Sequence, residues 1–245
     1  MNRRPVIRLL AAAALAACVA LPARADDKSD AVLKAAFKRL GDAKTMTADI
    51  TCVIKVEVLP QPIELKGTIV AMKPNFLRVE VKGEVPGVGE IQQVFAADGK
   101  DYYSYNRSAN VCLKAKLDAK PKEFLGMWEA EIDAFFGGEE SASKLETSSS
   151  GVEKVGDVEC DIVKVQTKFP DGLPRTLTYA IGKKDPIILR ASFGGPGEGQ
   201  REAQTNTLKN VKFGVEKEKK DFAYEPPKGV RVITPPSPPQ SDKDK

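Results

Sequence analysis

Strict alternation between apolar and polar residues is the feature that most constrains what this chain can fold into. From Thr45 onward, every second residue of a long segment is apolar: Met46, Ala48, Ile50, Cys52, Ile54, Val56 and Val58. A period of two places successive side chains on opposite faces of a β-strand. We therefore expect one face of this strand to be buried and the other to be mostly polar, as in an antiparallel sheet.

Similar segments recur along the chain at short intervals. They are residues 63–71, 76–82, 91–97, 101–105, 111–117, 158–169, 175–181, 187–193, 202–208 and 211–213. Asp98-Gly99, between two of them, is a signal for a tight hairpin, and residues 139–151 are expected to be a polar link. Because turns rather than helices join the segments, the sequence predicts about ten antiparallel strands and disfavours a parallel α/β sheet.

Two segments have helical spacing instead. The first has apolar residues at Leu33, Ala36, Phe37 and Leu40, follows the acidic cap residues 26–30 and ends at Gly41. The second is expected over residues 121–136 and has one apolar face: Phe124, Leu125, Trp128, Ile132, Phe135 and Phe136. The predicted fold class is mainly β (α+β), an unclosed antiparallel β-barrel or strongly curved sheet with helices over its apolar concave face.

Residues 1–25 have the pattern of a secretory signal peptide. Three arginines precede an apolar stretch, Leu9 to Leu21, that is shorter than the roughly 20 residues of a membrane span. Cleavage after Ala25 is favoured because the longer apolar run fits that site, but Cys18 follows Leu-Ala-Ala and resembles the lipidation site of bacterial lipoproteins. We expect a periplasmic protein, or alternatively a lipid-anchored outer-membrane lipoprotein, with no transmembrane segment after the signal peptide.

Composition removes several function classes. The chain has no histidine, which excludes Ser-His-Asp and Cys-His catalysis and histidine metal sites. Residues 1–25 hold four arginines, and the rest of the chain has 34 basic and 34 acidic residues, so no nucleic-acid partner is expected. The acids at 129–133 lie on the polar face of the expected helix, and no Walker, calcium-loop or nucleophile-elbow motif occurs. We expect no enzyme, cofactor or metal site.

After export, the expected organisation is a single domain over residues 26–233 and a disordered, proline-rich tail over residues 234–245. Three cysteines remain in this part of the chain, Cys52, Cys112 and Cys160. Their number is odd and their spacing fits no metal site, so their pairing stays open and they are expected to pack as small apolar side chains.

Three motifs in sequence order resemble those of the LolA family of bacterial lipoprotein carriers. Gly67 to Arg78, with Lys-Pro-Asn at 73–75, resembles the family's Gly…Arg-Pro-Asn strand pair. Asp98-Gly99-Lys100, followed by tyrosines, is similar to its Asp-Gly-Lys hairpin, and residues 222–230 are similar to its closing Phe-x-Phe-x-Pro-Pro-x-Gly-Val. The order of helix, strands and hairpins agrees over about residues 27–232.

The resemblance implies a half-barrel with a helical lid over a cavity that holds the acyl chains of lipoproteins or other lipids. In the family, the cargo passes from a membrane transporter to an outer-membrane receptor. Lys73 stands where the family has an arginine that ties the sheet to the lid, and Leu40 matches a lid leucine. With the alternation pattern, the predicted ligand-binding residues are Leu40, Ile50, Ile54, Ile69, Lys73, Leu77, Val79, Tyr103, Phe124, Trp128 and Ile132.

Other roles on the same fold stay open, because Lys73 replaces the arginine and two stretches, 82–92 and 139–158, differ from LolA. One alternative is a sensor or protein-interaction module of the RseB type. Another is an outer-membrane-anchored receptor of the LolB type, which has a protruding apolar loop at the position of residues 83–90. Val85 and Val88 would be its tip residues here, although a plain longer hairpin is the favoured interpretation.

Overall fold

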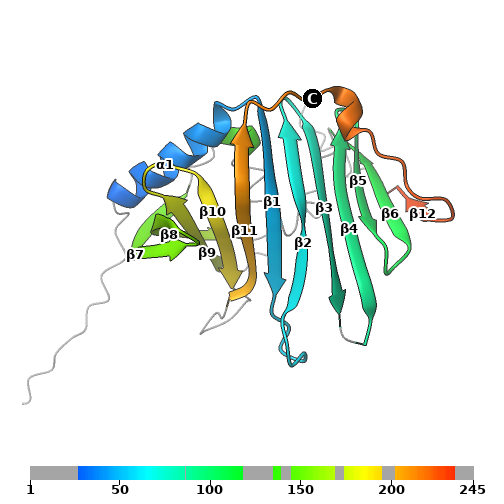
Figure 1. Ribbon diagram of the computed structural model, residues 1–245, viewed down its shortest axis with the longest axis horizontal. Coiled ribbons are helices and arrows are strands. Elements are labelled where there is room, and N and C mark those ends of the chain that lie inside the picture. Colours follow the sequence, from blue (N-terminus) through cyan, green and yellow to red (C-terminus); the bar gives the residue numbers. More distant parts are fainter. Residues whose placement is uncertain are drawn as a thin grey trace, which may run out of the picture.

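The computed structural model describes residues 27–85, 87–117, 135–138, 145–168, 174–194 and 202–234. In this part of the chain, 12 strands form one sheet in the order β12-β6-β5-β4-β3-β2-β1-β11-β10-β9-β8-β7. The two ends of that order are different strands that do not pair with each other, so the sheet is not closed into a barrel. Figure 1 shows the sheet curving beneath the single long helix described, α1. The mainly β, unclosed fold predicted from the sequence is confirmed.

The elements have the following bounds: α1 Asp27–Gly41, β1 Thr45–Ile54, β2 Ile63–Met72, β3 Phe76–Val85, β4 Gly89–Asp98, β5 Asp101–Asn106, β6 Val111–Lys116, β7 Glu146–Val155, β8 Val158–Lys168, β9 Pro174–Gly182, β10 Ile188–Gly194, β11 Glu202–Phe213, the 3-10 helix η4 Lys219–Phe222, and β12 Arg231–Ile233. Residues 135–138 are also helical.

The centre of the sheet is made by strands that are far apart in sequence. β1 pairs with its neighbour β2 and, on its other side, with β11, so that Ile50 lies opposite both Gly67 and Leu208. Nearly all pairs are antiparallel, as predicted, but β12 pairs with β6 in parallel. β12 follows β11 after a segment that passes through η4 and reaches the edge of the sheet at β6 (Figure 1).

Four local expectations are corrected. β1 ends at Ile54, so the apolar alternation outlasts the strand and leaves Val58 86% exposed. The expected polar link 139–151 contains the start of β7, and the two expected pieces at 202–208 and 211–213 are one strand, β11. In the β3–β4 hairpin, strand pairing extends to Val85 and Gly89. Of the two valines expected at the tip of the loop, Val85 is buried and Val88 is exposed.

The backbones of β2 and β3 approach each other closely at two glycines. The inward position of β2 opposite Val81 is Gly67, and a Cβ atom there would overlap the carbonyl oxygen of Glu80. Gly83 is in the same situation against the carbonyl oxygen of Glu64. Glycine within a strand permits such close backbone approach and is common at barrel bends, so these residues allow the concave shape.

Helix α1 lies against β7, β8 and β9. Its predicted apolar residues Leu33, Ala36, Phe37 and Leu40 are all buried, which confirms the face read from the helical spacing. Phe37 packs edge-on against Tyr179 of β9, with ring centroids 6.2 Å apart. The helix therefore covers one end of the concave face with a continuous apolar stripe.

Candidate functional site

The concave face of the sheet is the largest apolar surface of the fold. Side chains from β1 to β6, from β8 to β11 and from α1 share one buried cluster there, and only a few of its members are aromatic. The predicted residues Leu40, Ile50, Ile69, Leu77 and Val79 all belong to it. Ile54 is partly buried and packs against its edge. The strand alternation thus located this face correctly, whereas Phe124, Trp128 and Ile132 lie outside the described residues.

Tyr103 was assigned to the wrong face. It belongs to a second cluster on the convex side of β4, β5 and β6, together with Val94, Ala96, Tyr105 and Cys112. The adjacent Tyr102 is the residue of β5 that joins the concave cluster. Both neighbours are buried because β5 is covered on both faces, so alternation of apolar residues does not reveal which of the two points inward.

A small cavity lies inside the concave cluster beneath the end of α1. Six aliphatic or thioether side chains line it, from α1, β1, β11 and the start of β10: Leu40, Met46, Ile187, Ile188, Leu208 and Val211. Its free volume is about 10 Å³, room for roughly one water molecule. A cavity of this volume does not hold an acyl chain.

Most of these cavity residues were not among the predicted binding residues. Leu208 and Val211 lie on β11, which reaches the site only because it pairs with β1, more than 150 positions earlier in the chain. A long-range pairing of this kind leaves no local signal in the sequence. The apolar residues of 202–213 were the only hint, and they were assigned to two separate strands.

Lys73 connects the β2–β3 turn to the end of α1. Its ammonium group donates a hydrogen bond to the carbonyl oxygen of Gly41, the last residue of the helix, and lies 5.5 Å from the ring centroid of Phe135. A cation at a helix C-terminus is favourable because it meets the negative end of the helix dipole. The structure therefore brings the predicted tie residue to the helix that covers the cavity, and adds Phe135, which is 1% exposed.

The remaining polar contacts of α1 lie along its rim. Near the C-terminus, Arg39 pairs with Asp185 at 3.4 Å and stacks over the ring of Phe213 at 4.3 Å. Near the N-terminus, Thr147 of β7 donates a hydrogen bond to Asp30. Exposed ion pairs contribute about 0–1 kcal/mol each, so the apolar underside supplies most of the attachment of α1.

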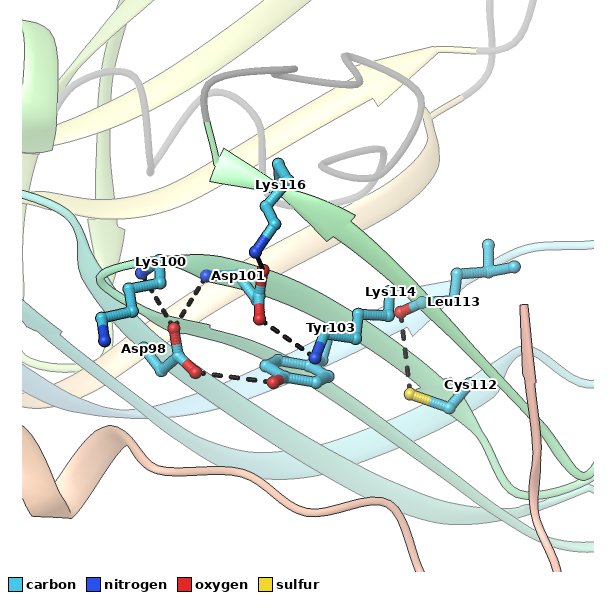
Figure 2. A network of polar contacts seen from close by, with 8 residues as sticks. All are labelled: Asp98, Lys100, Asp101, Tyr103, Cys112, Leu113, Lys114 and Lys116. Atoms are coloured by element: carbon cyan, nitrogen blue, oxygen red, sulfur yellow. Dashed lines mark hydrogen bonds and ion pairs between the residues drawn. The ribbon is translucent and has the colours of Figure 1, made fainter. Parts of the chain in front are cut away.

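A polar network occupies the convex face beside the second cluster (Figure 2). Asp101 accepts from Lys116 at 2.7 Å and from Lys114 at 3.0 Å, while Lys114 also lies 5.2 Å from the ring centroid of Tyr103. The hydrogen bonds from Lys116 and Lys114 lower the pKa of Asp101. Burial raises the pKa of the Cys112 thiol nearby. A thiol of raised pKa and a carboxylate neutralised by lysines form a structural network rather than a reactive pair.

Residues 219–233, here called the C-terminal strap, close the convex cluster. Phe222 is fully buried against the ring of Phe76, with centroids 5.5 Å apart, and Tyr224 packs at the same distance on Tyr103. Arg78 donates to the carbonyl oxygen of Ala223 at 3.0 Å. These contacts explain the aromatic motif at 222–224, which covers the sheet from outside.

The three cysteines of the described residues are buried in three different apolar clusters: Cys52 in the concave one, Cys112 in the convex one, and Cys160, on β8, in a third formed by β8 and β9. Across the described residues, no group of three or more Cys, Asp or Glu side chains is placed to hold a metal ion. None of the helices described is long and apolar enough to span a membrane.

The described geometry defines a class: an open, strongly curved antiparallel half-barrel with a helix across one end of its apolar concave face. The crystal structure of an uncharacterized conserved protein from Thermus thermophilus has this fold; it aligns with a TM-score of 0.51 and 17% identity, covering 85% of this chain and 99% of that one. At this identity the likeness concerns the fold alone.

Other similar structures include LprF from Mycobacterium bovis, with a TM-score of 0.49, 12% identity and coverage of 80% of this chain and 97% of that one. LolA superfamily protein NE2245 from Nitrosomonas europaea aligns with a TM-score of 0.38 and 9% identity, covering 80% of this chain and 97% of that one. No protein-family model and no curated protein sequence matches the chain.

Proposed function

We propose that this protein binds the acyl chains of a lipid or lipoprotein on the concave face and carries them across the periplasm. The observation that supports this most is the cavity beneath α1, which six apolar side chains line and which the end of the helix covers. Each methylene group transferred from water to such a surface contributes about 0.8 kcal/mol. Burial alone therefore accounts for binding, and no catalytic group is required.

Loading requires α1 to separate from the sheet, because the closed cavity has a free volume of only about 10 Å³. Lys73 and the rim pair Arg39–Asp185 would then open, while the underside of the helix contacts the ligand instead of β7, β8 and β9. Acyl chains would replace contacts that α1 makes in the empty protein. The net free energy of taking up or releasing an acyl chain would therefore be small, which suits transfer of a lipid between two membranes.

A periplasmic location is part of this proposal and is supported by the signal-peptide pattern of residues 1–25. A different role, binding a partner protein as an RseB-type module, is favoured by one observation. β7 is an edge strand of 10 residues, most of them exposed, and it could accept a strand from a partner. The two roles differ in which surface is used.

The test compares two neighbouring positions of β1 with opposite orientation. Ile54 packs against the concave cluster, whereas Val53 is on the other face, and both are only partly buried, so either should accept glutamate without unfolding. We expect Ile54→Glu to abolish binding of a fluorescent fatty acid and Val53→Glu to bind like the original protein. Equal binding by both variants, or no binding by the unmodified protein, would contradict the proposal and favour the interaction module.

A further inference from the structure

Three polar side chains lie on the concave face among the apolar ones, and they differ in whether their polar atoms form hydrogen bonds. Gln204 and Asn206 of β11 are 5% and 1% exposed, and the Gln204 amide donates to the Asn206 side-chain oxygen at 3.0 Å. Gln93 of β4 differs from this pair. Its side-chain oxygen is buried and makes no hydrogen bond within the described structure.

The register of the sheet shows that Gln93 is on the concave face. It lies opposite Val81 of β3, a member of the concave cluster, and the alternate residues Ile91, Phe95 and Ala97 of β4 also join that cluster. The neighbours of opposite orientation, Val94 and Ala96, belong to the convex cluster instead. Solvent does not reach the Gln93 oxygen, because its exposed area is below 1 Å².

A single row of paired positions connects this oxygen to the cavity. Leu208, which lines the cavity, is opposite Ile50; the row continues through Gly67 and Val81 to Gln93. Neighbouring strands are about 4.8 Å apart, so the row is about 19 Å long along the sheet. Between its two ends it contains only apolar side chains and a glycine. An acyl chain that replaced the packing contacts along this row would have its tail at the cavity and its first carbons near Gln93.

An unpartnered buried acceptor is costly to retain, because the group has lost its water without gaining a protein donor. A ligand that donates a hydrogen bond to this oxygen therefore gains more binding free energy than one that forms a hydrogen bond at the protein surface. We propose, building on the lipid-binding function above, that Gln93 recognises the polar end of the ligand and that the preferred ligand joins its acyl chain to a hydrogen-bond donor. An amide N–H or a hydroxyl supplies such a donor, whereas a plain ester does not.

Two probes with the same chain test this proposal: oleamide, which has an amide donor, and methyl oleate, which has none. Each is titrated against a bound fluorescent fatty acid. We expect the full chain to bind oleamide about tenfold more tightly than methyl oleate, the effect of about 1.4 kcal/mol. In Gln93→Met, which keeps the side-chain length and removes the acceptor, the two affinities should become equal.

Gln92 provides the matched control, since it is the adjacent glutamine and lies on the other face of β4. Gln92→Met should keep the tenfold preference. Gln93→Leu repeats the test if the methionine variant folds poorly, as judged by circular dichroism. A preference that survives both Gln93 variants, or equal affinities in the unmodified protein, would overturn the role of Gln93 while leaving lipid binding intact. Failure of the unmodified protein to bind either probe would instead overturn the proposed function and this inference with it.

Discussion

On its concave side the sheet meets α1, whereas on its convex side strands β4, β5 and β6 are covered by the C-terminal strap of the same chain. The two covers are built differently. The strap inserts Phe222 and Tyr224 between aromatic side chains and ends in a strand that pairs with β6. The helix makes an aromatic contact, Phe37 with Tyr179, and beneath its C-terminal end it lies on aliphatic side chains that leave a cavity. A lysine holds this end of the helix.

From this difference we infer which of the two covers can separate from the sheet. Aromatic packing together with strand pairing closes the convex face as part of the folded core. The aliphatic contacts beneath the end of α1 are non-directional, so an acyl chain can replace them. Stability should therefore depend most on the strap, and ligand binding on α1 and the concave face.

The largest expected effect is that of Phe222→Ala. The ring is fully buried against Phe76, so its removal should lower the free energy of unfolding by about 3–5 kcal/mol. Urea denaturation measures this loss. Lys220→Ala, at an exposed position of the same short helix, is the control and should change stability little. Fatty-acid affinity of the folded Phe222→Ala protein should be unchanged, and a parallel loss of affinity would remove the distinction between the two faces.

A smaller effect is expected for Lys73→Ala. Loss of the hydrogen bond to Gly41 should lower the free energy of unfolding by about 1–2 kcal/mol. Because the bond holds the cover, bound fatty acid should leave about five to ten times faster, which stopped-flow fluorescence can follow. Lys73→Arg keeps the charge and a donor and should restore slow release. An unchanged release rate in Lys73→Ala would show that α1 is not the gate.

The smallest effect concerns pH and the convex network of Figure 2. Lys116 and Lys114 lower the pKa of Asp101, so the carboxylate contributes stability above the unfolded pKa of about 3.9, and this contribution is lost as the pH falls through the lower folded value. Asp101→Asn should be less stable than the unmodified protein at pH 7 by about 1–2 kcal/mol. The difference should shrink below about pH 4 in denaturation curves. If the difference in stability between the two proteins persisted at about pH 2, the charge of the Asp101 carboxylate would not be its cause.

The sequence predicted the regions in which a single local pattern determines the structure. The buried stripe of α1 and the inward residues of β1 follow from periods of 3.6 and two, and Ile50, Ile69 and Val79 were placed correctly for that reason. The hairpins with short turns followed from their turn residues, as at Asp98-Gly99.

The sequence did not predict the structure where a strand is buried on both faces, or where contacts between segments distant in sequence determine it. Tyr102 and Tyr103 are adjacent and both buried, so no pattern could show that Tyr103 belongs beneath the strap. β12 is only three residues long and is held by its pairing with β6 rather than by its own composition. Gln93 looked like one polar residue among many, and only the register of β3 and β4 shows that it points inward.

The most direct measurement of the central claim is photocrosslinking with a fatty acid that carries a diazirine near the end of its chain, followed by peptide mass spectrometry. The account predicts labels on α1, β1 and β11, around the cavity formed by Leu40, Met46 and Leu208, and none on the strap. Unlabelled oleamide should compete for these sites. Labels confined to the strap and the convex faces of β4–β6, or labels on the cavity residues that oleamide does not displace, would contradict the claim that the concave face is the lipid-binding surface.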